Sequence, residues 1–263
     1  MIYQSVWIRK NSCPLSGADQ KGFISEGRDV FDLRLIIRNS FLLIRSTWTK
    51  CNDLYLNIET IHPRSETHAV SKSARPWWFG PISEEARHGD NHAYTSPDYW
   101  YVRKVIGILK PGPDDVFYDI GSGKGRIICL VARTAVQKCV GIELLKPLCE
   151  LAARNALSLH GKRAKVEILC SDAASADLSE GTLYFMFNPF GPATLSDTLE
   201  NIGTSLARNP RQIKIVYYNP VHESILKACP WLEKFREFRT LGGLRVTFWR
   251  SLVTEVVKLG NFQ

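Results

Sequence analysis

From Asp115 onward, short apolar runs alternate with longer segments whose apolar residues recur at helical spacing. The apolar runs predict buried strands over residues 115–121, 138–144, 165–173, 181–190 and 212–220. The intervening segments predict helices over residues 125–135, 146–161, 193–207 and 222–229. Two last runs, over residues 234–241 and 244–252, are joined through two glycines and predict an antiparallel hairpin.

Strands that alternate with helices predict a parallel sheet whose two faces are covered by helices. The fold class expected is therefore α/β: a Rossmann-like, seven-stranded, mostly parallel sheet with helices on both faces and an antiparallel closing strand. We expect this domain over residues 113–253. Residues 76–112 read as a loop rich in proline, glycine and aromatics, followed by a helix over residues 100–109 that the "KPGPDD" segment ends.

Residues 1–75 form an N-terminal extension of uncertain fold, because their periodicity is weak and turn-forming residues are frequent. One segment in it, residues 31–48, predicts an amphipathic helix on which Arg34, Arg38 and Arg45 share one face. Docking of this helix on the main domain is the favoured interpretation. A helix that lies on a membrane surface or binds a partner is the alternative.

Composition and charge narrow the class of protein only a little. The 263 residues carry a net charge of +8, which allows an acidic partner without requiring one. The N-terminus has no convincing signal peptide, and no run is long and uncharged enough to span a bilayer, so a cytoplasmic protein is expected. The seven cysteines include no CxxC pair, so the sequence predicts no metal site.

The segment "VFYDIGSGKGRI", residues 116–127, brings a ligand close to the backbone, because three glycines fall at alternate positions. A phosphate-binding P-loop would need GxxxxGK[ST], and that register is absent. The dinucleotide fingerprint GxGxxG would need a third glycine where Arg126 stands. The remaining pattern is D-x-G-x-G-x-G at the end of a strand, and it begins at Asp119.

This pattern resembles motif I of the class I, seven-strand methyltransferases that use S-adenosylmethionine. The form "D-[IL]-G-S-G-x-G-[RQ]" is similar to that of the non-SET histone-lysine methyltransferases. The resemblance implies S-adenosylmethionine as cofactor, with Asp119 at its amino end, Glu143 on the ribose hydroxyls and Asp172 at the adenine. The implied cofactor-binding residues are Tyr94 as a lid, Asp119, Gly121, Ser122, Gly123, Gly125, Glu143, Asp172, Ala173 and Asn188.

Asn188, Pro189 and Phe190 follow the fourth strand and are the candidate catalytic residues, at the end where the methyl acceptor would bind. An amide oxygen and a backbone carbonyl there can accept hydrogen bonds from an amine, and an aromatic ring can contact a cation. The segment resembles the "[DNS]-P-P-[YF]" motif of amino-methyltransferases with one proline missing, which argues against a nucleobase acceptor. A second such pair, Asn219 and Pro220, ends the fifth strand and is interpreted as structural.

The function predicted is methyl transfer to a nitrogen of a protein, with lysine as acceptor. Alternatives are an RNA or DNA methyltransferase, a small-molecule acceptor, and a non-catalytic scaffold that binds S-adenosylmethionine. His88 and His92 precede the lid candidate and read as residues of a solvated loop. The basic, aromatic-containing stretch from Arg208 onward predicts a solvated edge, with a nucleic-acid face as the alternative. Oligomeric state is not predicted.

Overall fold

The computed structural model describes residues 33–60 and 96–252. Residue contacts group the chain into two compact units, Met1–Asn39 and Ser40–Gln263, so the dividing line falls inside the first helix, α1 (Leu33–Leu56). Tyr94, His88 and His92 lie outside the described residues. The predicted boundaries at residues 75 and 112 stay predictions.

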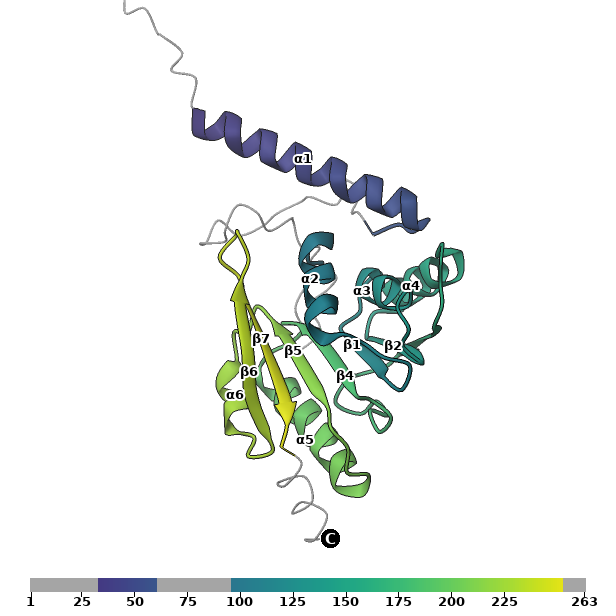
Figure 1. Ribbon diagram of the computed structural model, residues 1–263, viewed down its shortest axis with the longest axis vertical. Coiled ribbons are helices and arrows are strands. Elements are labelled where there is room, and N and C mark those ends of the chain that lie inside the picture. The colour runs from purple at the N-terminus through teal and green to yellow at the C-terminus, as the bar shows by residue number, and fades with distance from the viewer. Residues whose placement is uncertain (1–32, 61–95, 253–263) are drawn as a thin grey trace, which may run out of the picture. The chain divides into compact units, whose positions relative to one another are not determined.

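The second unit is built on one seven-stranded sheet with the order β3-β2-β1-β4-β5-β7-β6 (Figure 1). Its strands are β1 (Val116–Ile120), β2 (Lys138–Glu143), β3 (Lys165–Cys170), β4 (Leu183–Phe187), β5 (Lys214–Tyr218), β6 (Leu232–Arg239) and β7 (Arg245–Ser251). Its helices, besides α1, are α2 (Tyr99–Leu109), α3 (Arg126–Val131), α4 (Lys146–Ser158), α5 (Pro192–Arg208) and α6 (Glu223–Ala228).

The predicted fold class is confirmed. Strands β1 to β5 pair in parallel, and β7 inserts antiparallel between β5 and β6, which makes the β6–β7 hairpin the closing edge. Strand order reverses between β1 and β4, because β2 and β3 lie on one side of β1 while β4 and β5 lie on the other. Open α/β sheets bind ligands at this reversal point, beyond the carboxyl ends of the strands.

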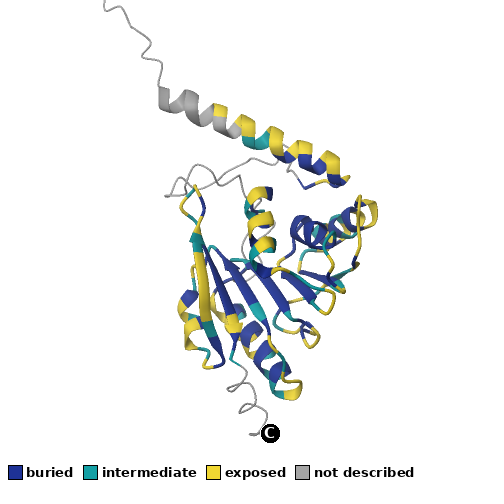
Figure 2. Ribbon diagram, in the orientation of Figure 1, coloured by how far each residue is buried: buried dark blue, intermediate teal, exposed yellow. Residues whose placement is uncertain are grey.

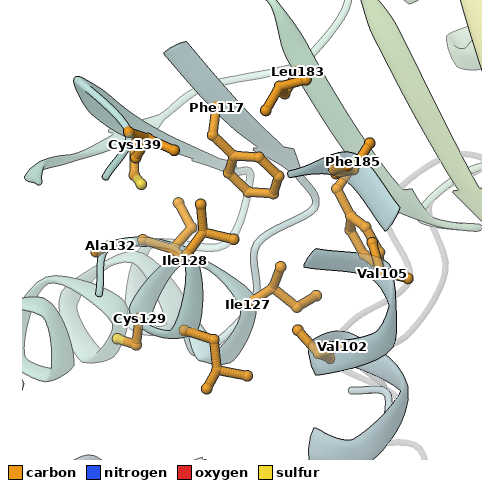
Figure 3. Close-up of a cluster of buried hydrophobic side chains, with 14 of the residues drawn as sticks. Val102, Val105, Phe117, Ile127, Ile128, Cys129, Ala132, Cys139, Leu183 and Phe185 are labelled. Atoms are coloured by element: carbon orange, nitrogen blue, oxygen red, sulfur yellow. The ribbon is translucent and has the colours of Figure 1, made fainter. Parts of the chain in front are cut away.

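Two hydrophobic cores cover the two faces of the sheet, as alternation along the strands requires. On one face, α2 and α3 pack against Phe117 and Phe185, as Figure 3 shows for Val102, Ile127 and Ile128. On the other face, α5 and α6 pack against the alternate residues of the same strands. Figure 2 shows the central strands buried and the outer strand β6 largely exposed.

Helix α1 extends beyond the predicted residues 31–48, to Leu56, and its docked side is mainly polar apart from the fully buried Leu56. Within the compact unit, Thr49, Asn52 and Asp53 are buried, and Arg45 Nε donates to Asp98 Oδ1 at 2.6 Å. The exposed side carries the large apolar residues Leu43, Ile44, Trp48, Leu54 and Tyr55. Arg45 thus lies on the docked side of the helix, whereas the amphipathic pattern by itself favours burial of the apolar side. The side chains of Arg34 and Arg38 lie outside those described.

No helix within residues 33–60 and 96–252 combines the length and the apolar character that crossing a membrane requires.

Candidate active site

The glycine loop after β1 lies directly against the segment after β4. A Cβ atom added at Gly121 would come within 2.5 Å of Pro189 Cβ, so the two segments approach as closely as a glycine permits. Gly121 has a φ of +75°, in the left-handed region that favours glycine. The predicted motif I and the predicted acceptor segment therefore meet at one place, the reversal point between β1 and β4.

Asp119, the fourth residue of β1, carries a buried carboxyl group. It is 1% exposed, and among the described residues neither of its carboxylate oxygens has a hydrogen-bond partner. Burial raises the pKa of Asp119 well above its ordinary value, and the nearby Glu143 carboxylate raises it further. A buried carboxyl group in this state is costly unless a ligand supplies donors or a positive charge.

Glu143 ends β2 and is held by backbone donors. Its Oε2 accepts the N–H of Gly123 at 2.8 Å, and its Oε1 accepts the N–H of Leu145 at 3.0 Å. Burial raises the pKa of Glu143, while these backbone hydrogen bonds act in the opposite direction. Each carboxylate oxygen can accept more than one hydrogen bond, so the group keeps acceptor capacity for hydroxyls of a ligand.

The rest of the loop is shaped by close approaches to neighbouring elements. Gly123 and Gly125 have φ of +53° and +79°. A Cβ atom at Gly125 would lie 3.2 Å from Ala152 Cβ, which shows how closely the loop packs on α4. Ser122 is buried, and its hydroxyl oxygen has no hydrogen-bond partner among the described residues. A Cβ atom on Gly141 of β2 would reach that oxygen at 2.9 Å.

Asp172 and Ala173 follow β3 in a turn at the same edge of the sheet. The Asp172 side chain is exposed, and its Oδ1 accepts the N–H of Ala174 at 2.9 Å. Ala173 is buried. Asp172 therefore caps a turn. Its contact with adenine stays a prediction.

The acceptor segment contains one residue with unusual backbone geometry and one buried ring. Asn188 has a φ of +39° and, like Pro189, is only half-buried. Phe190 is 3% exposed and packs in the core formed with α5, so its ring supports the segment from inside. Asn219, at the end of β5, is also left-handed, with a φ of +54°.

The polar groups of this site that lack partners among the described residues suit S-adenosylmethionine. The orphaned carboxyl of Asp119 and the orphaned hydroxyl of Ser122 call for a ligand with donors, and Asp119 favours one that is cationic. The glycines of the loop have no side chains, so a ligand can approach the loop backbone at this edge of the sheet. S-adenosylmethionine carries an amino group, a sulfonium and ribose hydroxyls, and so offers what these groups lack.

Comparison with known proteins agrees with this geometry. The family model described as "Histone methylation protein DOT1" matches residues 85–169, which include the glycine loop, Glu143 and β3 up to Leu169. A protein-lysine N-methyltransferase of Saccharolobus islandicus is 34% identical over 87 residues, 33% of this chain and 53% of that protein. The matched region thus resembles methyltransferases, and the sheet around it has the seven-stranded, mostly parallel order expected of the class I enzymes that use S-adenosylmethionine.

Two further similarities were found. A histone-lysine N-methyltransferase of Caenorhabditis elegans, H3 lysine-79 specific, is 43% identical over 56 residues, 21% of this chain and 6% of that protein. The match therefore spans about half the length of the first curated relative and a small part of the second. An RNA methyltransferase from Salinibacter ruber, solved with S-adenosyl-L-homocysteine, is 26% identical with a TM-score of 0.47 over 60% of this chain and 94% of that one.

Sequence reasoning missed three side chains that shape the candidate site. From the sequence, Arg126 is only the residue that fails to match the third glycine of the dinucleotide fingerprint. In the structure it is buried and donates hydrogen bonds to the hydroxyl of Thr60 and to the carbonyl of Pro97. Asn155 of α4 donates to the carbonyl of Lys124 in the loop at 2.8 Å. Tyr217 of β5 donates to Asn188. None of these contacts is local, so no motif could have indicated them.

The basic stretch from Arg208 onward is largely paired. Lys234 and Arg245 form ion pairs with Glu223 and Glu237, and Arg250 pairs with Glu233. Trp249 is buried, Phe238 lies against the ring of Phe248, and Phe235 is 37% exposed. The contacts favour the solvated-edge interpretation, because most of these charges already have partners within the chain.

Proposed function

We propose that the chain transfers a methyl group from S-adenosylmethionine to the side-chain nitrogen of lysine in a protein. One observation carries the proposal: the Gly121–Pro189 contact joins the glycine loop to the Asn188 segment at the reversal point of the sheet. The named lysine methyltransferases that resemble residues around this loop support lysine as the acceptor. The missing proline after Asn188 argues against a nucleobase.

The cofactor would be held by residues at three strand ends. Asp119 and Ser122 offer a carboxyl group and a hydroxyl that lack partners among the described residues, and Glu143 offers carboxylate oxygens beside the backbone of Gly123. Asp172 and Ala173 lie on the next strand end, where we propose that they contact the adenine. When bound, S-adenosylmethionine supplies a methyl group already activated by a sulfonium, so the protein mainly has to align the acceptor.

The acceptor end has to bind a neutral amine and exclude water. A lysine loses its proton more readily where its charged form is poorly solvated, because desolvation lowers the pKa of an ammonium group. Asn188 and the backbone near Pro189 provide acceptors for amine N–H groups at a half-buried position. Phe190 supports this segment from the core and limits the space behind it.

The first test is binding. The purified full chain is titrated calorimetrically with S-adenosylmethionine and S-adenosylhomocysteine, beside a Glu143→Ala variant and an NADH control. We expect micromolar binding of both adenosyl ligands, loss of binding in the variant, and no binding of NADH. A Glu167→Gln variant removes an acid of β3 that pairs with Lys138 away from the glycine loop, and it should bind as the natural protein does.

The second test sorts the acceptors. Cell lysate is incubated with the protein and methyl-labelled S-adenosylmethionine, then digested with either protease or nuclease, and the labelled residue is identified by mass spectrometry. Label recovered as methyl-lysine supports the proposal. Label confined to nucleic acid, with binding that falls steeply with salt, would establish the nucleic-acid alternative. Label confined to metabolites would point to a small-molecule acceptor. Binding of S-adenosylmethionine without methyl transfer to any acceptor would support the non-catalytic scaffold.

A further inference from the structure

The hydroxyl group of Tyr217 lies behind the acceptor segment and is bonded to it. Tyr217 is the fourth residue of β5 and is 1% exposed. Its hydroxyl donates to Asn188 Oδ1 at 2.9 Å, and its oxygen accepts the backbone N–H of His222 at 3.4 Å. Because the oxygen accepts from His222, the single hydroxyl proton is left for Asn188. Burial raises the pKa of Tyr217 to about 12, so the group remains a donor near neutral pH.

This contact determines how the Asn188 amide is turned. A side-chain amide has an oxygen at one end and an NH₂ group at the other, and rotation by half a turn exchanges them. A donor that reaches the oxygen from the buried side makes the exchanged arrangement unfavourable, because two donors would then face each other. The left-handed backbone at Asn188, with a φ of +39°, limits the remaining freedom of the residue.

We propose that Tyr217 is a positioning residue for methyl transfer: it holds the Asn188 amide in one orientation, so that the amine acceptor meets a fixed set of donors and acceptors. The inference rests on the proposed function and adds to it a residue from a strand that carries no motif. Tyr217 acts through Asn188 and contacts neither cofactor nor acceptor in this account. Phe187 and Tyr218, whose ring centroids lie 4.6 Å apart, pack the same two strand ends on the opposite face of the sheet.

The main variant is Tyr217→Phe, which keeps the buried ring and removes only the hydroxyl. Its matched control is Tyr184→Phe on the neighbouring strand β4. Tyr184 is fully buried, and its hydroxyl donates to the carbonyl of Leu178 at 2.7 Å, at the amino-terminal end of that strand. Both variants remove a buried hydroxyl together with its hydrogen bonds, so a general loss of stability would affect both, whereas only Tyr217→Phe releases Asn188.

Turnover measurements separate positioning from a purely structural effect. We expect Tyr217→Phe to lower kcat about tenfold, the scale of a modest misalignment, with the affinity for S-adenosylmethionine unchanged. A double-mutant cycle adds the variant Asn188→Gly, since glycine tolerates the positive φ, and the double variant that carries both substitutions. If Tyr217 acts through Asn188, the double variant is no slower than Asn188→Gly alone. If the losses of kcat in the two single variants instead multiply in the double variant, the proposal is overturned.

A binding measurement tests the same idea without turnover. Sinefungin is an analogue of S-adenosylmethionine that carries an amine in place of the transferable methyl, whereas S-adenosylhomocysteine has no group there. We expect Tyr217→Phe to weaken binding of the amine analogue about tenfold relative to S-adenosylhomocysteine, and Tyr184→Phe to leave that ratio unchanged. An unchanged ratio in Tyr217→Phe would refute the positioning role.

The outcomes for the two proposals can be told apart. A shifted ratio in a protein that labels no lysine would support the role of Tyr217 while refuting the lysine acceptor. A natural protein that binds neither analogue would overturn the proposed function, and the role of Tyr217 with it.

Discussion

Arg126 and Thr60 are joined by two hydrogen bonds that cross from the glycine loop to the end of the α1 segment. Nε and Nη2 of Arg126 lie 2.8 and 2.7 Å from the single hydroxyl oxygen of Thr60. Thr60 in turn donates to Asp53 at 2.9 Å, and Tyr99 also donates to Asp53. The arginine lies over the ring of Tyr99, 4.8 Å from its centroid. An arginine thus fits after the loop because the chain around it supplies acceptors and an aromatic face.

Replacement of Arg126 by leucine should destabilise the protein strongly. Thr60 and the carbonyl of Pro97 would lose a buried cationic donor, and we expect the free energy of unfolding to fall by about 3 kcal/mol. Urea denaturation followed by circular dichroism measures the loss. Arg250→Leu is the control, because Arg250 is 47% exposed in its ion pair with Glu233, and it should cost less than about 1 kcal/mol. Equal losses would contradict a special role for Arg126.

Asp119→Asn should make the ligand-free protein more stable at neutral and alkaline pH. The pKa of Asp119 is raised on folding, so between its ordinary value of 3.8 and the raised value the folded state binds more protons than the unfolded state. Stability of the natural protein therefore falls as pH rises through this window, and the neutral amide escapes that loss.

At pH 8 we expect an advantage of about 1–3 kcal/mol for Asp119→Asn, which narrows as the pH is lowered toward the ordinary value. Urea denaturation at a series of pH values in the absence of ligand provides the test. The same variant should bind S-adenosylmethionine more weakly. If the natural protein were the more stable at pH 8, the carboxylate would have to be satisfied within the chain.

Gly121→Ala should disturb both the fold and the cofactor site. The added Cβ would meet Pro189 at 2.5 Å, and the φ of +75° is unfavourable for alanine, so a loss of about 1–3 kcal/mol and about tenfold weaker binding of S-adenosylhomocysteine are expected. Gly107→Ala is the opposite case. Gly107 lies on the exposed side of α2 with open space at its Cβ, and alanine there should stabilise by about 0.5–1 kcal/mol. Thermal unfolding that showed the same sign for both variants would refute this contrast.

Asn155→Leu should loosen the glycine loop from α4. The Asn155 side chain bonds both backbone groups of Glu59 and the carbonyl of Lys124, and leucine would leave all three without this partner. We expect a loss of about 2–4 kcal/mol in unfolding free energy and faster amide exchange in the loop. Leu157→Gln on the same helix alters a side chain that is 79% exposed, and it should change stability by less than about 0.5 kcal/mol. Unchanged exchange in Asn155→Leu would show that the loop is held by other contacts.

The sequence by itself determined in which order strands and helices follow one another along the chain from β1 to β7. Each predicted strand and helix from residue 100 onward appears in the structure, with ends that differ by a few residues. The reason is physical: strands buried on both faces need uninterrupted apolar runs, and helices need apolar residues at helical spacing, so both leave a local mark. For the same reason the sequence alone places Asp119, Glu143 and Asn188 at or next to strand ends.

Only the tertiary structure decided which of these residues touch, and through which partners. Arg126 and Thr60 are 66 residues apart in the chain, and Tyr217 and Asn188 are 29 apart. The polar face that α1 turns toward Asp98 is likewise invisible to periodicity, which favours burial of the apolar face instead. Local sequence sets the conformation of a segment. The contacts between segments depend on strand order, crossover geometry and buried polar partners, which no single stretch of the chain encodes.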